Sequence, residues 1–195
     1  MMIVFFDLDG IMLAEFVPRN TTVYSEYYKG LLGRLRNDVR RKRPEKWANS
    51  FFLHRDNSPC HASLMVWQFL SNENITMCPH PPYSPDLAPC YFWLFPKVKM
   101  TMKGKHLELI QDIEAATTAQ LKTLTKEDFQ NCFRKWQEER WDVCSKQGGS
   151  ILRGINGNVS FSVIVIFYLN IWSVRSWTIG RYFPEVYISA FHPAS

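Results

Sequence analysis

Residues 50–61, Ser-Phe-Phe-Leu-His-Arg-Asp-Asn-Ser-Pro-Cys-His, change from an apolar run to charged residues at Arg55 and Asp56. This pattern is typical of a buried strand whose carboxyl end presents an acid at the edge of a sheet. Residues 79–95 follow as Pro-His-Pro-Pro-Tyr-Ser-Pro-Asp-Leu-Ala-Pro-Cys-Tyr-Phe-Trp-Leu-Phe. Because proline fixes φ and has no N–H donor, residues 79–89 can form neither a regular helix nor a full strand. We therefore expect a strand, a stiff loop, and an aromatic helix that begins near Tyr91.

Together these two motifs resemble the catalytic domain of Tc1/mariner transposases, most closely the mariner branch. In that branch a strand ends in Leu-His-x-Asp-Asn-x-Pro-x-His, which residues 53–61 match, and the proline-rich segment of residues 79–89 comes after it. The resemblance covers about residues 1–149. It implies an α/β, ribonuclease-H-like fold, in which helices flank a mixed sheet.

The resemblance also implies a chemistry. In the family, three aspartates hold two divalent cations, Mg²⁺ or Mn²⁺, which promote displacement at a DNA phosphate. Asp56 matches the second aspartate, as catalytic residue and metal ligand. The family spacing puts the third at position 91, where this chain has Tyr91. A neutral phenol, with a pKa near about 10, is a poor magnesium ligand.

The first acid of the family lies on a central strand upstream of residues 2–6. We therefore expect a sheet that lacks its first strand, with unpaired backbone groups and doubtful stability. With one acid of three, we expect weak or absent metal binding and a remnant transposase that is catalytically inactive.

The second predicted site is a basic segment, Arg40-Arg41-Lys42-Arg43, at the end of a helix that Pro44 stops. These cations could lie along a DNA backbone, the partner that the resemblance implies, as transposon ends in the family. They could equally be a solvated helix end that complements the helix dipole. A net charge of +5 permits a nucleic-acid partner without demanding one. DNA as partner implies a nuclear protein, and a homodimer is left open.

Two alternatives differ in class. Phe5-Phe6-Asp7-Leu8-Asp9-Gly10 also resembles the first motif of haloacid-dehalogenase-like phosphohydrolases, with Asp7 as nucleophile and Asp9 as general acid/base. The same residues fit a strand over 2–6 that turns back into a strand over 11–17. A third hypothesis is a non-enzymatic DNA-binding or interaction protein that reuses the remnant fold.

The chain divides into a partial catalytic domain, 1–149, and a hydrophobic tail, 150–195, without family resemblance. Residues 159–172 are apolar, but 14 residues are fewer than the roughly 20 that cross a bilayer. We expect no membrane association, no signal peptide and no designed role for the tail. Five cysteines at unrelated spacings indicate reduced thiols in an intracellular protein.

Helices are predicted from the spacing of apolar residues and from capping residues. Thr22 is the expected N-cap of the first, and Thr125 with Asp128 is expected to form a capping box for the last. Their predicted ranges are 22–43, 61–72, 110–124 and 125–146.

Overall fold

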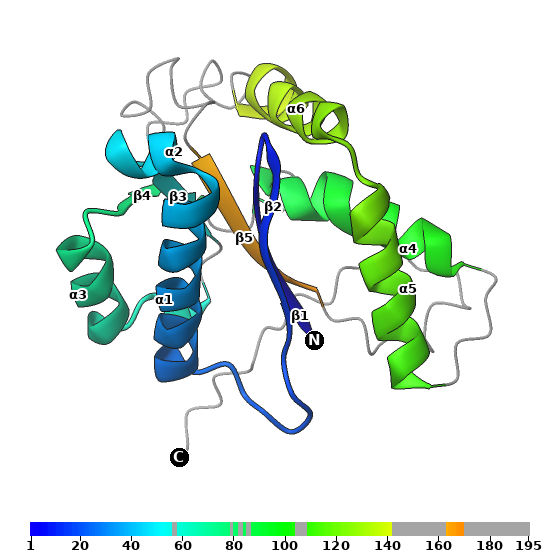
Figure 1. Cartoon of the computed structure of the whole chain (residues 1–195), viewed down its shortest axis with the longest axis horizontal. Coiled ribbons are helices and arrows are strands. Elements are labelled where there is room, and N and C mark those ends of the chain that lie inside the picture. The colour runs from blue at the N-terminus through cyan, green and yellow to red at the C-terminus, as the bar shows by residue number, and fades with distance from the viewer. Residues whose placement is uncertain are drawn as a thin grey trace.

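The computed structural model describes residues 1–55, 58–78, 80, 81, 84, 87–103, 109–141 and 163–169. In these residues a five-stranded sheet has the order β2-β1-β5-β3-β4, and helices cover both of its faces (Figure 1). The strands are β1 (Met2–Asp7), β2 (Gly10–Phe16), β3 (Phe52–His54), β4 (Thr76–Cys78) and β5 (Val163–Leu169). The helices are α1 (Ser25–Lys42), α2 (Pro44–Ala48), α3 (Leu64–Asn72), α4 (Phe95–Met102), α5 (Ile110–Thr123) and α6 (Lys126–Lys135). Short turns of helix lie at Pro59–His61, Cys90–Leu94 and Trp136–Trp141.

The sheet is mixed, which confirms the predicted fold class. β1 pairs antiparallel with β2 and with β5, whereas β3 pairs parallel with β4 and with β5. The predicted hairpin is present as β1 and β2. Its turn needs Gly10, because the φ of +126° at this residue lies in a region that side chains disfavour.

The central strand of this sheet is the main difference from the expectation. Val163–Leu169, which the sequence assigned to a tail with no designed role, forms β5 between β1 and β3. β1 and β3 therefore each pair with β5 along the edges that were expected to be open. The prediction of unpaired backbone groups at this position is wrong. An apolar, β-branched run such as this one is typical of a strand covered on both faces. The boundary at residues 149 and 150 itself stays a prediction.

Side chains of β1 alternate between two buried clusters, one on each face of the sheet. The aromatic cluster, on the side of α4, α5 and α6, includes Phe6 from β1 and Val165 from β5. The α1 cluster, on the side of α1 and α3, includes Phe5 from β1 and Ile164 from β5. Figure 1 shows these two sets of helices on opposite faces. Because alternate residues of a strand point to opposite faces, the unbroken apolar run of β1 supplies both clusters.

Two helices, α1 and α3, begin three residues later than predicted. α1 begins at Ser25 after Tyr24, not at the predicted cap Thr22, and Tyr24 makes no side-chain capping bond. α3 begins at Leu64, where the Ser63 hydroxyl accepts from the Val66 N–H. The capping box of Thr125 and Asp128 is confirmed at the start of α6. No helix in the described ranges is long and apolar enough to cross a membrane.

Replacing Gly33 in α1 with alanine should stabilise the protein by about 0.5–1 kcal/mol, since glycine loses more backbone entropy in a helix. A Cβ at Gly33 would meet nothing within 4 Å. Gly10→Ala is the control and should destabilise the protein, because Gly10 has φ +126°. Urea denaturation of both variants measures the two changes, and a destabilising Gly33→Ala would contradict the prediction.

Candidate functional site

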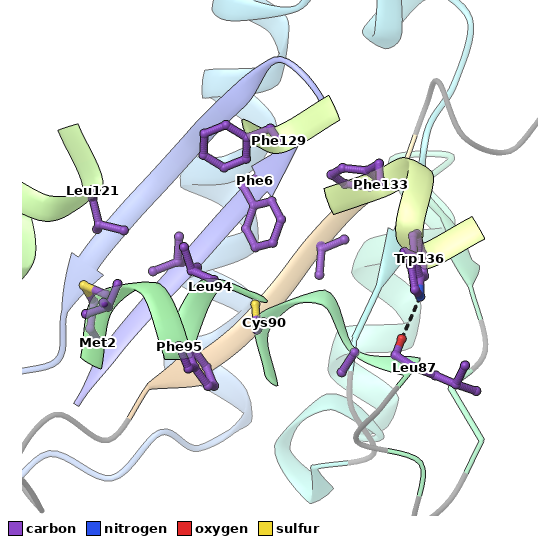
Figure 2. Close-up of a cluster of buried hydrophobic side chains, with 14 of the residues drawn as sticks. Met2, Phe6, Leu87, Cys90, Leu94, Phe95, Leu121, Phe129, Phe133 and Trp136 are labelled. Atoms are coloured by element: carbon purple, nitrogen blue, oxygen red, sulfur yellow. Dashed lines mark hydrogen bonds between the residues drawn. The ribbon is translucent and has the colours of Figure 1, made fainter. Parts of the chain in front are cut away.

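The end of the proline-rich loop is held by a tryptophan that lies far from it in sequence. Leu87 and Ala88 are buried, and the Trp136 indole Nε1 donates to the Leu87 carbonyl oxygen at 2.8 Å (Figure 2). Trp136 itself is 6% exposed. This bond connects residues 49 positions apart, so it fixes the loop end against the aromatic cluster.

Tyr91 lies in the turn of π-helix at Cys90–Leu94 that follows this loop. Its N–H donates to the Ala88 carbonyl at 2.9 Å, and its ring meets the Phe95 ring edge-on at 5.4 Å between centroids. The residue is half-buried. Position 91 therefore presents an aromatic ring packed on its neighbour, where the resemblance calls for a carboxylate.

The donors in the described part of the chain do not fit a pair of divalent cations. Asp56, the predicted ligand and catalytic residue, lies outside the described residues. Among the residues that are described, no three His, Cys, Asp or Glu side chains lie close enough to hold a metal ion. Tyr91 supplies only a phenol, and two adjacent cations need several carboxylates to neutralise them.

His54, at the end of β3, was not singled out by the sequence. It is fully buried, and its ring lies 5.2 Å from the His80 ring and 5.0 Å from the Trp136 ring. Its neighbour Arg55 lies over Trp67, with 5.7 Å from the guanidinium carbon to the ring centroid. His54 thus packs the strand end against the proline-rich loop. Its position at the end of a buried strand was the available signal.

The basic segment at the end of α1 has acidic and aromatic neighbours. Arg41 and Lys42 pair with Asp38 at 2.7 and 3.1 Å. The Arg40 guanidinium lies over the Trp47 ring at 5.4 Å. All three cationic residues are exposed to solvent, so they remain available to a phosphate backbone.

Arg43, the fourth predicted DNA-binding residue, belongs to a charge cluster that sequence reasoning missed. We call this the hairpin ion cluster: Asp7, Asp9, Arg43, Lys46 and Lys126. Asp7 is fully buried and accepts from Lys46 at 2.7 Å and from the Arg43 Nε at 3.1 Å. Asp9 pairs with Lys126 at 2.8 Å and with Lys46 at 3.3 Å. The cluster joins the β1–β2 turn to α2 and α6.

The cluster sets the protonation of Asp9. Burial raises the pKa of Asp9, but hydrogen bonds and charges from Lys126 and Lys46 outweigh it and hold the pKa below its ordinary value of 3.8. A carboxyl whose pKa is depressed by folding stabilises the fold above its unfolded pKa. This contribution is therefore present above about pH 4 and is lost as the pH falls through the folded pKa.

The hairpin ion cluster also bears on the phosphohydrolase hypothesis. A nucleophilic aspartate must reach its substrate. The Asp7 carboxylate has no exposed surface and is engaged by Lys46, Arg43 and the Asp9 N–H. Its geometry is that of a structural carboxylate that closes the hairpin turn.

Two lysines on α4, Lys97 and Lys99, are half-buried. Lys97 donates to Asp128 and lies 5.5 Å from the Trp93 ring. Burial lowers the pKa of Lys99 below its ordinary value of 10.5. Lys97 is thus bound to the capping box of α6, which favours a structural role for it.

Comparison with known proteins gives a consistent answer. Residues 1–49 match the family model described as transposase (partial DDE domain). The mariner Mos1 transposase of Drosophila mauritiana is 29% identical over 155 residues, which are 78% of this chain and 44% of that protein. The human histone-lysine N-methyltransferase SETMAR is 26% identical over 152 residues, 77% of this chain and 22% of that protein. The chain therefore spans less than half the length of these relatives.

The fold matches the same group. The crystal structure of the Mos1 catalytic domain aligns with 76% of this chain and 73% of that one, with a TM-score of 0.70 and 26% identity. The Mos1 paired-end complex with Mn aligns with 76% of this chain and 44% of that one, with a TM-score of 0.69 and 26% identity. Motifs, sheet topology and relatives agree, and they make this chain similar to mariner-type transposases over part of their ribonuclease-H-like catalytic domain.

Proposed function

We propose that this chain binds DNA through the exposed cations at the end of α1 and does not cut it. The observation that carries the second half is Tyr91, a half-buried ring packed at 5.4 Å on Phe95 at the position where the family has its third acid. The central strand adds support, because Val163–Leu169 contains no Asp or Glu. At the two catalytic positions that the resemblance locates in this sequence, Asp56 is retained and the other is Tyr91.

Metal binding is expected to be weak or absent for the same reason. The Mos1 catalytic domain has been solved with Mg and with Mn, and divalent cations of this kind need several oxygen ligands. Asp56 supplies one carboxylate, and Tyr91 supplies none. Isothermal titration with Mn²⁺ measures this directly.

The DNA half of the proposal is supported by charge and by the relatives. Arg40, Arg41 and Lys42 are exposed on one helix end, and the chain carries a net charge of +5. Mos1 has been solved as a paired-end complex with the left transposon end. Arg43 is proposed to contribute to DNA binding only indirectly, without contacting a phosphate, because its guanidinium pairs with Asp7 at 3.1 Å. Action on DNA would place the protein in the nucleus, which fluorescence microscopy of the tagged chain tests.

The triple variant Arg40→Gln, Arg41→Gln, Lys42→Gln should bind duplex DNA more weakly and with a shallower dependence on salt. Each lost phosphate contact lowers the slope of log affinity against log salt by about 0.9, so the slope should fall by about 3. Fluorescence anisotropy with a labelled duplex at several salt concentrations measures both quantities.

The matched control removes three charges elsewhere, from the exposed residues Lys29, Lys122 and Lys135. It should retain most of the affinity and the slope. Equal losses in the two triple variants would place binding elsewhere. Nicking of a transposon-end duplex by the unmodified chain in Mg²⁺ or Mn²⁺ would contradict the absence of cleavage.

A further inference from the structure

In the described residues, β5 is the strand that joins the two halves of the sheet. On one side β5 pairs antiparallel with β1, from Met2 opposite Leu169 to Phe6 opposite Val165. On the other side it pairs parallel with β3, from Phe52 opposite Val163 to His54 opposite Val165. β1 and β3 are not neighbours in the sheet. Without β5, the described sheet would be two separate strand pairs with facing open edges.

β5 also joins the two buried clusters. Val165 is fully buried in the aromatic cluster, and Ile164 is fully buried in the α1 cluster. Figure 1 shows the strand, in orange, running between the helices of the two faces. A charge at either position would be taken out of water with no charged partner among the cluster residues, which is costly.

We propose that the gap between β1 and β3 is a strand-binding site, which the chain fills in cis with Val163–Leu169. The site offers two hydrogen-bonding edges and two apolar faces, so it selects an extended segment without charged side chains. The sequence Val-Ile-Val-Ile-Phe-Tyr-Leu meets that requirement. Residues 142–162 connect it to the described part before it, and a connection of 21 residues can span up to about 70 Å when extended.

The occupant is the chain's own segment rather than a second copy. β5 pairs with β1 over Val165–Leu169 and with β3 over Val163–Val165, and both partner strands belong to the same chain. The proposal does not depend on DNA binding, and its test reads folding alone. It replaces the expectation that the tail, residues 150–195, has no designed role.

The first test is hydrogen exchange of the full, unmodified chain. Backbone amides of residues 163–169 should exchange as slowly as those of β1, within about tenfold, because a central strand opens only when the sheet opens. Exchange of 163–169 at the rate of an unstructured peptide would overturn the proposal.

The second test compares two introduced carboxylates in the full chain. Val165→Asp should lower the Tm by at least about 10 °C or abolish the cooperative transition, since it buries an unpaired charge. Leu64→Asp, at a residue that is 73% exposed on α3, is the control and should shift the Tm by less than about 2 °C. Val165→Ala provides a milder variant if the aspartate variant does not fold, and it should lower the Tm by about 5 °C. Equal Tm values for the parent, Val165→Asp and Val165→Ala would overturn the proposal.

The third measurement identifies the donor of the strand. Light scattering with size-exclusion chromatography should give the mass of one chain, 22.9 kDa, for the folded parent. A dimer in which residues 163–169 lose their protection when dilution separates the two chains would mean that the strand comes from a second copy, and it would overturn filling in cis.

Discussion

Trp136→Ala is expected to lower the free energy of unfolding by about 4 kcal/mol, in the range for deletion of a buried aromatic side chain. Trp136 is 6% exposed, and its ring lies 5.7 Å from Phe133 and 5.0 Å from His54. Its Nε1 also donates to the Leu87 carbonyl at 2.8 Å. The substitution would therefore leave a cavity between α6, β3 and the proline-rich loop.

Two further variants separate the contributions to this effect. Trp136→Phe keeps most of the ring and removes the bond to Leu87, so it should cost about 1–3 kcal/mol. Trp67→Ala, at a tryptophan that is 49% exposed, should cost less than about 1 kcal/mol because most of its surface is already in water. Urea denaturation measures all three. Equal costs for Trp136→Ala and Trp67→Ala would show that Trp136 does not hold the loop.

The sequence predicted the parts of the fold that depend on local chemistry. The hairpin of β1 and β2 followed from an apolar run, a turn with Gly10 and a second apolar run. The capping box at Thr125 followed from the spacing of two side chains. The stop of α1 before Pro44 followed from the missing N–H of proline. Each of these signals lies within a few residues, so one sequence contains all of it.

The position of β5 could not be predicted in the same way. A continuous apolar run gives no alternation, so periodicity does not distinguish a buried strand from another apolar segment. Nothing in residues 163–169 says which edges they meet. The sequence did indicate a missing central strand, and it did indicate an apolar segment after residue 149. That this segment fills the place of the missing strand depends on pairing between residues as far apart in sequence as Met2 and Leu169.

The functional residues also fall into those that a local motif identifies and those whose role depends on a distant partner. The signature motifs identified Asp56 and the replaced position at Tyr91, because the family pattern is contiguous in sequence. Arg43 was grouped with its three basic neighbours, whereas in the fold its side chain pairs with Asp7, 36 positions away. The difference between an exposed phosphate-binding cation and a buried ion-pair partner depends on that distant carboxylate. A run of basic residues therefore contains two kinds of site.

The second large effect is expected for Asp7→Ala, which should lower the free energy of unfolding by about 3 kcal/mol. Asp7 is fully buried, and its carboxylate accepts from Lys46 at 2.7 Å, from Arg43 at 3.1 Å and from the Asp9 N–H at 2.8 Å. Removing one partner of a buried ion pair leaves the other charge poorly compensated, at a cost of about 3–5 kcal/mol. Here Asp9 still pairs with Lys46 at 3.3 Å, which places the expected cost at the low end.

Asp38→Ala is the matched control, because Asp38 also pairs with two cations. Its partners Arg41 and Lys42 have side chains that are 71% and 36% exposed, and such surface pairs contribute about 0–1 kcal/mol. Urea denaturation at pH 7 compares the two variants. A cost for Asp7→Ala no greater than that for Asp38→Ala would mean that the hairpin ion cluster contributes no more than a surface pair. The expected difference instead means that Asp7 and Asp9 hold the hairpin turn against α2 and α6. Lys46 lies on α2, Lys126 lies on α6, and Arg43 directly precedes α2.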